Sequence, residues 1–379
     1  MKRDLLSLIY NPDPFWPHPL TVEPTGFKNK ALGAFHVNLA IGCSHGCRFC
    51  YVPSVSAIKQ AKKLRKLGVT QPMFGWGSYL FPRLWNEHAF RLSLRKAMET
   101  PDSKLLPDGN RAVFYCSTTD AFQVSRHWNP KVKQLHQGQM DLLFRRSLEL
   151  IRDESDLRVR ILTRSPLSAN YFDLMKTLGD RLLFGMSIPS LDDEVVRLYE
   201  PHAPGVQKRL ECLQKAKQEG LHVYVAVAPT FPEQGIGDFR KILTVINSLD
   251  PVTVFHEPVN VRGGNVDLME GEFRPKGIDF HGDIFRSPKN WAVYAARALK
   301  EFELAAHEVG LAEVLKLWPD TALLTEESMD AVVESGLFAD HLEMANWITR
   351  QWEIPSAWPD VADLVGQTND SHEGRCGDV

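Results

Sequence analysis

The stretch Gly42-Cys-Ser-His-Gly-Cys-Arg-Phe-Cys-Tyr51 carries three cysteines, Cys43, Cys47 and Cys50, within eight residues. An extended residue spans only about 3.5 Å, so three thiolates on one short loop can bind a single compact metal centre. Structural zinc sites and most iron–sulfur sites use four protein ligands. A set of three leaves one metal position for a substrate or a cofactor. The spacing therefore predicts a metal centre that takes part in a reaction.

Two alternatives to an open metal centre are a zinc site completed by His45 or by a distant residue, and a chance spacing. The paired ligands typical of zinc sites are absent, because the sequence has neither another Cys-x-x-Cys pair nor a His-x-x-x-His pair. This favours the open centre. The other cysteines are too scattered to bind a second cluster, and they indicate the reduced thiols of a cytoplasmic protein: Cys116, Cys212 and Cys376.

The composition predicts a globular protein with a large core. Hydrophobic residues make up 44% of the 379 residues and charged residues 24%, which suits one sizeable domain with additions. The formal charge of −3 gives no overall basic field, so nucleic-acid binding would depend on a local basic patch. The first ten residues are only briefly apolar before the proline-rich run at 11–17, so we expect no signal peptide and no membrane span.

Short β-branched runs alternate with longer helical patterns, which is typical of βα units and a parallel sheet. Six strands are expected, at Phe35–Ile41, Arg111–Ser117, Leu157–Thr163, Arg181–Ser187, Leu221–Ala228 and Val252–His256. Helices are expected at Val55–Leu67, 138–153, 167–178, 206–219, 237–248 and Asn290–Val309, with two more over 325–350 and a possible seventh strand at Glu313–Trp318.

The long first crossover predicts a helical insertion over the carboxyl ends of the strands, either as a functional lid or as an inert addition. We divide the chain into an N-terminal extension, a core with this insertion, a mostly helical C-terminal extension and a polar tail that we expect to be disordered. Their bounds are 1–34, 35–260 with the insertion at 68–110, 261–365 and 366–379.

An aromatic residue, Phe49, precedes the third cysteine and completes a pattern that resembles the signature of the radical S-adenosylmethionine (radical SAM) enzymes. The resemblance implies an α/β fold, a partial (β/α)6 TIM-like barrel, which the six expected βα units match. It implies that the three thiolates hold three irons of a 4Fe-4S cluster and that SAM chelates the fourth. A reducing partner such as flavodoxin or ferredoxin would then drive cleavage of SAM to a 5′-deoxyadenosyl radical, which abstracts hydrogen from the substrate.

Over about residues 35–260 the chain resembles the spore photoproduct lyase-like proteins, also called DNA repair photolyase-like. The runs that carry this resemblance are 42–51, 118–123, 162–166, 200–210 and 227–229. In the spore photoproduct lyases a cysteine at the end of the second strand returns hydrogen to the thymine product, and Cys116 lies close to that place. The alternative is a buried core cysteine, because a shift of one residue along a strand turns a side chain to the other face.

SAM is expected to lie across the strand ends beside the cysteine loop, since this loop follows the first strand. The residues expected to contact SAM are Phe49, Tyr51, Ser117, Thr118, Thr119, Asp120, Arg164, Ser187 and Ala228. The hydroxyls and the carboxylate after the second strand suit the amino group or ribose of SAM, and Arg164 suits its carboxylate. The alternatives are a turn or helix cap at 117–120, a surface arginine, and a serine or alanine that only packs.

The expected substrate contacts are basic side chains of the first helix, two tryptophans of the insertion and a pair after the sixth strand, namely Lys62, Lys63, Arg65, Lys66, Trp76, Trp85, His256 and Glu257. Basic and aromatic side chains together suit the phosphates and bases of a nucleic acid. The alternatives are a solvated helix face, core tryptophans and a hydrogen-bonded barrel rim. The sequence thus predicts a radical SAM enzyme that acts on a nucleobase in DNA or RNA. Modification of a small molecule or peptide, and a non-catalytic metal-binding module, are the alternative functions.

Overall fold

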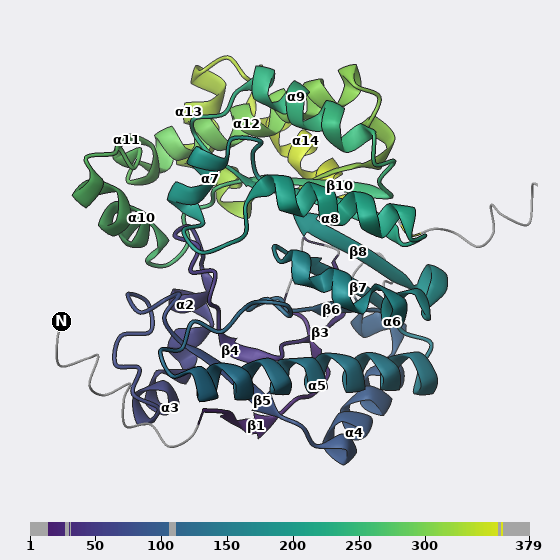
Figure 1. The fold of residues 1–379 in the computed structure, drawn as a ribbon. Helices are drawn as coiled ribbons and strands as arrows, with labels where there is room; N and C mark the ends of the chain where they lie inside the picture. Colours follow the sequence, from purple (N-terminus) through teal and green to yellow (C-terminus); the bar gives the residue numbers. More distant parts are fainter. Residues whose placement is uncertain (1–13, 27–29, 31, 106–110, 355–357, 359–379) are drawn as a thin grey trace, which may run out of the picture.

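The main sheet contains eight of the described strands, and seven of them run parallel in the order of the chain (Figure 1). Across the sheet the strands are β11 (Leu315–Leu317), β10 (Thr253–Pro258), β9 (His222–Thr230), β8 (Leu182–Ser187), β7 (Arg158–Thr163), β6 (Ala112–Tyr115), β3 (Phe35–Val37) and the antiparallel β2 (Glu23–Pro24). The structure is a computed structural model that describes residues 14–26, 30, 32–105, 111–354 and 358. The expected polar tail at 366–379 lies outside the described residues.

Helices connect the parallel strands, as such crossovers must. α5 (Pro130–Glu154) links β6 to β7, and η3 (Pro166–Tyr171) with α6 (Phe172–Lys176) links β7 to β8. α7 (Asp193–Tyr199) and α8 (Val206–Gln218) link β8 to β9, and α9 (Ile236–Asn247) links β9 to β10. The predicted α/β fold with a parallel sheet is confirmed. The strands β2 and β11 form the two edges of this sheet, and its closure into a partial barrel stays a prediction.

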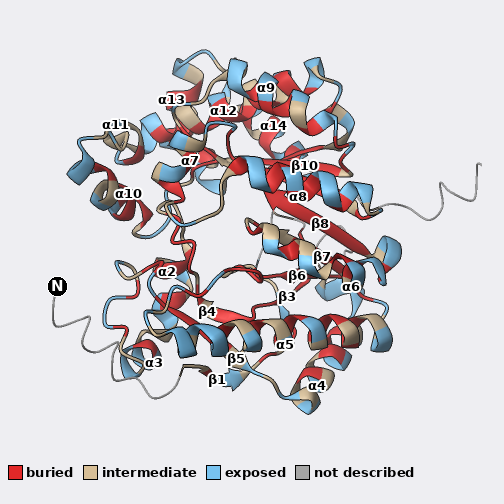
Figure 2. Ribbon diagram, in the orientation of Figure 1, coloured by how far each residue is buried: buried red, intermediate tan, exposed pale blue. Residues whose placement is uncertain are grey.

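Alternate side chains of the parallel strands pack into two separate cores, because successive residues of a strand point to opposite faces. The outer face, which includes Val113, Val159, Phe184 and Val225, packs against α5, α8, α9 and α12. The inner face carries Phe114, Leu183, Tyr224, Phe255 and Trp318. Figure 2 shows that these strands are buried almost throughout.

The inner face is filled at one end of the strands and accessible at the other. Arg160, Leu183 and Tyr224 lie on this face and have no exposed area. Further along the same strands, Leu162 and Ala228 are partly exposed. The accessible end is the carboxyl end of the parallel strands, where α/β proteins place their functional side chains.

The first predicted strand, Phe35–Ile41, is wrong as a single element. It forms β3 in the main sheet and β4 (Ala40–Gly42) in a second sheet of order β1-β5-β4, with β1 (Trp16–Pro19) and β5 (Leu80–Leu84). The break occurs because the Asn38 side chain accepts a hydrogen bond from Thr118 N–H, while Leu39 O accepts one from Arg83 N–H in β5. The chain therefore changes sheets just before the cysteine loop.

The segment after the cysteine loop also differs from the prediction. The single expected helix at Val55–Leu67 is divided into α2 (Val52–Val55), η1 (Ala57–Gln60) and α3 (Ala61–Lys66). The 68–110 insertion contains the strand β5 as well as the expected helix, α4 (Glu87–Met98) and the short η2 (Asp102–Lys104). β5 packs against α5, and the placement of the insertion over the strand ends stays a prediction.

The C-terminal extension is mostly helical, as expected, with α10 (Asn265–Phe273), η5 (Arg274–Lys276), α11 (Gly282–Phe285), α12 (Pro288–Glu308), η6 (Ala312–Val314), η7 (Thr321–Leu324), α13 (Glu326–Glu334) and α14 (His341–Glu353). The long helix α12 packs between α9 and α13 and buries a row of alanines against the outer face. The possible seventh strand is present as β11. Within the described ranges, every helix is too short or too polar to cross a lipid bilayer.

Candidate metal and cofactor site

The cysteine loop follows β4 and is closed by two glycines in left-handed conformations. Gly42 has a φ of +94° and Gly46 a φ of +60°. A Cβ atom on Gly42 would lie 2.3 Å from Tyr79 O, and one on Gly46 would lie 2.9 Å from Gly77 Cα. No L side chain fits either position without moving the backbone, so the glycines allow the loop to pack closely on residues 77–79.

The three cysteine thiols lie close to one another, since the charges of Cys47 and Cys50 both act on Cys43. A structural zinc ion takes four protein ligands, with Zn–S bonds of about 2.3 Å. Three thiols on one loop leave a fourth position open, as a centre that binds a cofactor requires.

Burial raises the pKa of all three thiols, that of Cys50 to about 11. A metal must therefore displace protons to bind, which makes its affinity depend on pH. Cys50 accepts hydrogen bonds from the Val52 amide and the Trp76 indole, and these donors favour the thiolate form. Donors of this kind tune an iron–sulfur centre. Of the two tryptophans expected in the substrate site, Trp76 instead lies buried against the cysteine loop.

The segment after β6 holds the cysteine loop in place. Thr119 Oγ1 donates a hydrogen bond to Gly42 O over 2.6 Å, and Gln123 Oε1 accepts one from Ser44 N–H over 2.5 Å. The Gln123 amide also donates to Thr119 Oγ1 over 2.7 Å. Thr119, expected to contact SAM, is thus bonded to the loop that carries the cysteines.

The neighbouring residues of this segment are also bonded within the protein. Ser117 Oγ and Thr118 N–H both bond to the Asn38 side chain. Asp120 is buried, and its carboxylate accepts hydrogen bonds from Thr163 Oγ1 at 2.8 Å and from Arg164 N–H at 2.9 Å. The structure therefore brings the 117–120 segment to the cysteine loop, where Asp120 joins the ends of β6 and β7.

Arg164 belongs to a buried ion-pair group at the end of β7. Its Nε donates to Glu200 Oε1 over 2.7 Å, and Arg209 Nη2 donates to Glu200 Oε2 over 2.5 Å. Burial alone would raise the pKa of Glu200, but the two guanidinium groups outweigh it and lower that pKa to about 2. Glu200 is therefore a carboxylate at neutral pH, and it fixes the Arg164 guanidinium close to the cysteine loop.

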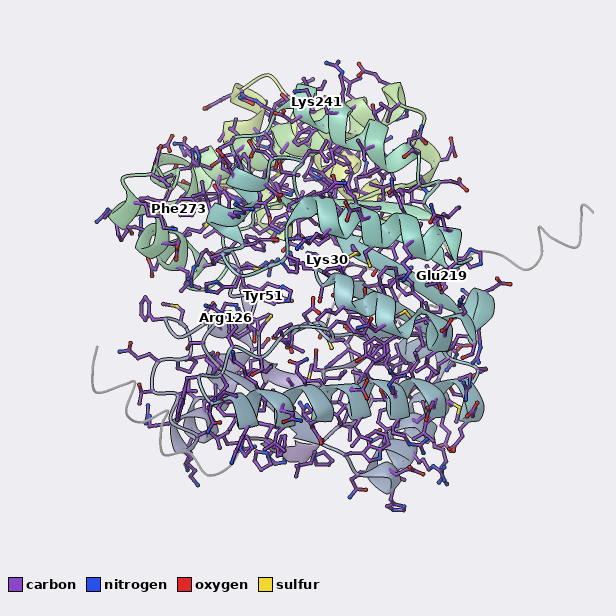
Figure 3. All side chains as sticks on the ribbon, viewed as in Figure 1. Lys30, Tyr51, Arg126, Glu219, Lys241 and Phe273 are labelled. Carbon is purple, nitrogen blue, oxygen red and sulfur yellow. The ribbon has the colours of Figure 1, made fainter. Side chains whose placement is uncertain are left out.

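The two aromatic residues of the loop pack against different cores, Phe49 against the outer core and Tyr51 against the core that contains Trp76. The Arg164 guanidinium lies 5.7 Å from the centre of the Phe49 ring, and Asn265 Nδ2 donates to Phe49 O over 2.9 Å. Tyr51 lies near Cys50 and Glu257, and burial together with these neighbours raises its pKa. Lys30, labelled with Tyr51 in Figure 3, forms an ion pair with the same Glu257.

Ser187 and Ala228, on neighbouring strands, are brought together by the fold. Ser187 Oγ donates to Ala228 O over 2.8 Å, so the hydroxyl bonds to the backbone of the next strand. Ala228 stays partly exposed on the inner face. Ala228 therefore lies at an accessible position, whereas Ser187 is buried and joins β8 to β9.

Cys116 lies in the outer core and not on the inner face. It follows Tyr115 with a φ of +48°, which breaks the strand alternation that would have placed it beside Phe114. Its thiol packs with the outer core, near Leu39, and burial raises its pKa. This is the environment of a buried core cysteine.

The expected substrate residues are spread over several separate places. The basic side chains of α3, namely Lys62, Lys63, Arg65 and Lys66, are all exposed, and Lys63 Nζ lies 2.8 Å from His18 Nε2. Trp85 packs on Phe90, at the far end of β5 from the cysteine loop. The structure therefore does not gather these residues and Trp76 into one surface.

His256 and Glu257 point to opposite faces of β10, as neighbours on a strand do. His256 is fully buried and stacks on Phe302 of α12 at 3.8 Å, and burial lowers its pKa to about 3. Glu257 lies on the inner face, where it pairs with Lys30 and accepts a hydrogen bond from Asn260. Only Glu257 of this pair lies on the side of the accessible strand ends.

The structure adds residues that the sequence did not single out: Gln123, Glu200, Arg209 and Lys30. The first three lie within or beside runs that carried the family resemblance, so those runs were the available signal. Nothing in the local sequence marks Lys30, because its partner Glu257 is 227 residues away.

No family model matches the chain. It is 31% identical over 261 residues to the uncharacterized protein ORF301 of Acidianus two-tailed virus, a match that covers 67% of this chain and 77% of the viral protein. It is 23% identical over 236 residues to the uncharacterized protein MJ0683 of Methanocaldococcus jannaschii, over 62% of this chain and 72% of that protein.

Among solved structures, the chain is similar to spore photoproduct lyase complexed with dinucleoside spore photoproduct. The TM-score is 0.51 at 14% identity, over 75% of this chain and 76% of that chain. A variant of the same lyase with bound AdoMet and the dinucleoside matches with a TM-score of 0.50 at 15% identity, over the same shares. At this identity, the likeness concerns the fold.

Proposed function

We propose a radical SAM function on the premise that the chain belongs to the same family as the viral protein ORF301 and has the fold of spore photoproduct lyase. Cys43, Cys47 and Cys50 would hold a 4Fe-4S cluster with one iron open to SAM. Bound there, the cluster and SAM supply a 5′-deoxyadenosyl radical that abstracts hydrogen from a substrate. The observation that carries the proposal is the three-thiol loop, fixed at the accessible carboxyl ends of a parallel sheet.

The protein's own residues position this chemistry. Thr119 and Gln123 hold the loop, and Trp76 and the Val52 amide donate hydrogen bonds to Cys50. Trp76 is buried, which keeps water from that side of the cysteines.

Arg164 is the residue best placed to bind the SAM carboxylate. One of its donors, Nε, is used by Glu200, and a guanidinium has five donors in a planar fork that suits a carboxylate. Its side chain is 21% exposed, although Glu200, which holds it, is fully buried. Glu200 would therefore act as a positioning residue. Phe49, which lies beneath the Arg164 guanidinium, would contact the rest of the cofactor together with Tyr51 and Ala228.

A nucleobase in DNA or RNA is our leading substrate class, with a flavodoxin or ferredoxin as the reducing partner. The solved neighbour that binds a dinucleoside supports this class, as do the four exposed basic side chains of α3. Binding that depends on phosphate contacts should weaken steeply with salt. Neutralising these four residues should then weaken binding of any DNA or RNA sequence. No binding at low salt would favour a small-molecule substrate.

The experiment that tests the reaction class is anaerobic reconstitution with iron and sulfide, followed by reduction in the presence of SAM. We expect 5′-deoxyadenosine by liquid chromatography, and none from a Cys43→Ala, Cys47→Ala or Cys50→Ala variant. Cys212→Ala is the matched control, because Cys212 is buried under η3, away from the loop, and should keep full activity. Zinc with a fourth protein ligand in anaerobically prepared protein, or cleavage by a variant that lacks one of the three cysteines, would refute the proposal.

A further inference from the structure

A cavity of about 310 Å³ lies beside the cysteine loop, and none of the residues proposed to bind SAM lines it. It is formed by the loop itself, the segment after β6, the start of η3 and the segment that leads into α8. The residues that line it are Ser44, His45, Val124, Arg126, Ser165, Pro166, Leu167, His202, Pro204 and Lys208. Its volume falls at the lower end of the range of small-molecule sites, which is about 300–1,000 Å³.

The lining of this cavity carries cations and no carboxylate. Arg126 and Lys208 supply two positive charges, and His202 lies beside them. Arg48, nearby, is neutralised by Glu272 at 2.9 Å. No described carboxylate forms an ion pair with Arg126 or Lys208, and burial together with the nearby Arg48 lowers the pKa of Arg126. An anionic ligand would offset the electrostatic repulsion between these positive charges.

His45 supplies a second, independent sign of a ligand. It is 4% exposed and lines the cavity, and its Nδ1 has no hydrogen-bond partner. Its other nitrogen, Nε2, lies 3.9 Å from Asp120 Oδ2, which is too far for a hydrogen bond. A buried polar atom without a partner is unfavourable, and Nδ1 would gain a partner if the imidazole turned towards a ligand in the cavity.

The opposite side of the cavity is apolar. Val124 and Leu167 are 55% and 41% exposed, which is high for such side chains, and Pro166 and Pro204 complete this side. A ligand that fits both sides has an anionic end and a less polar remainder. Phosphate is the anion that best suits two cations and a neutral hydrogen-bond donor, because it carries several acceptor oxygens.

We propose that this cavity binds a phosphorylated small molecule, with the phosphate group bonded to Arg126, Lys208 and His45 Nδ1 and the remainder packed on Val124 and Leu167. The site goes beyond the proposed SAM chemistry and does not depend on it, because none of these side chains is assigned to the cluster or to SAM. Ser44, His45 and Gly46 separate Cys43 from Cys47, so a ligand bonded to His45 would lie two residues along the chain from each of these cysteines.

Isothermal titration of the reconstituted protein at low salt tests the site with three probes: inorganic phosphate, adenosine monophosphate and adenosine. We expect the two phosphates to bind and adenosine to bind much more weakly. An Arg126→Met/Lys208→Met variant should bind adenosine monophosphate about 100-fold more weakly, because each lost charge-assisted contact is worth about tenfold. A Lys241→Met/Arg350→Met variant is the control with the same loss of charge, from exposed positions on α9 and α14 (Figure 3 labels Lys241).

A second variant guards against misfolding of the first. Leu167→Asp adds a negative charge at an exposed position on the rim and should also weaken phosphate binding. The proposal is overturned if neither phosphate probe binds at low salt, if adenosine binds as tightly as its monophosphate, or if the Arg126→Met/Lys208→Met variant binds like the control. SAM cleavage measured on the same samples reports on the proposed function separately.

Discussion

Replacing Glu200 by glutamine should destabilise the protein by about 3 to 5 kcal/mol, because it leaves two guanidinium groups without their shared anion in a buried site. Both oxygens of the Glu200 carboxylate accept hydrogen bonds from arginines, at 2.7 Å from Arg164 and at 2.5 Å from Arg209. The side chains of Glu200 and Arg209 have no exposed area, so water cannot replace the lost interaction.

The pKa of Glu200 gives a second value for the same effect. Burial would raise this pKa, but the two arginines lower it from 4.5 to about 2. That difference corresponds to about 3 kcal/mol of folding free energy. Since the pKa is lower in the folded state, the contribution is complete above about pH 4.5 and is lost as the pH falls towards 2. The difference in stability between wild type and Glu200→Gln should therefore shrink in acid.

Denaturant unfolding of both proteins, prepared without iron because acid destroys iron–sulfur clusters, measures this difference at pH 7 and pH 3. Glu219→Gln is the matched control. Glu219, labelled in Figure 3, directly follows α8, the helix that contains Arg209. Its side chain is 29% exposed and pairs with Lys176 at 3.0 Å. Removing such a surface pair should change stability by less than about 1 kcal/mol. Equal losses in the two variants, or a difference for Glu200→Gln that does not shrink in acid, would refute the reasoning.

Gly46→Ala should destabilise the protein by at least about 2 kcal/mol, because it combines left-handed strain with a backbone clash. The control Gly138→Ala, in α5, meets open space and should stabilise the protein by about 0.5 to 1 kcal/mol. If thermal unfolding ranks the two variants in the opposite order, the close packing of the cysteine loop is contradicted. Thr119→Val removes the hydroxyl that donates to Gly42 O and should lower the free energy of unfolding by about 1 to 2 kcal/mol. It should also reduce the iron that the reconstituted protein retains after gel filtration. An iron content equal to that of the wild type would contradict this prediction. Burial lowers the pKa of His256 to about 3 in the folded protein. As the pH falls below about 6, the unfolded chain takes up a proton at this histidine before the folded protein does. The free energy of unfolding should therefore decrease by up to about 1.4 kcal/mol for each pH unit. His256→Leu should flatten this dependence in denaturant midpoints at pH 7 and pH 5, and equal slopes for the two proteins would disprove the assignment.

The location of most elements followed from local patterns in the sequence. The strands β6 to β10 and the helices α8, α9 and α12 lie within a few residues of where periodicity placed them, whereas α5 begins eight residues before the predicted helix at 138–153. This succeeded because a parallel strand with both faces buried is a continuous apolar run, and a helix over its outer face is amphipathic. The three candidate metal ligands were equally predictable, because the spacing of cysteines within one loop determines which thiols can bind the same metal centre.

Elements that depend on contacts distant in the sequence were not predictable. Phe35–Ile41 has the composition of one strand, and only the bonds from Asn38 to residues 117–118 and from Leu39 to β5 divide it between two sheets. The helix after the cysteine loop is also divided, into α2, η1 and α3. Strand propensity describes a single segment, whereas the break in the first strand comes from partners many residues away.

For the candidate site, the sequence by itself determined which residues are present, and the tertiary structure decided the direction in which each one points. A left-handed φ turns Cys116 to the outer core, and strand alternation separates His256 from Glu257. Arg164 depends on Glu200, 36 residues later, for its position. The spacing of three thiols is a local property of the chain, whereas the charge partner of a buried side chain and the face on which it lies are set only when distant segments pack together.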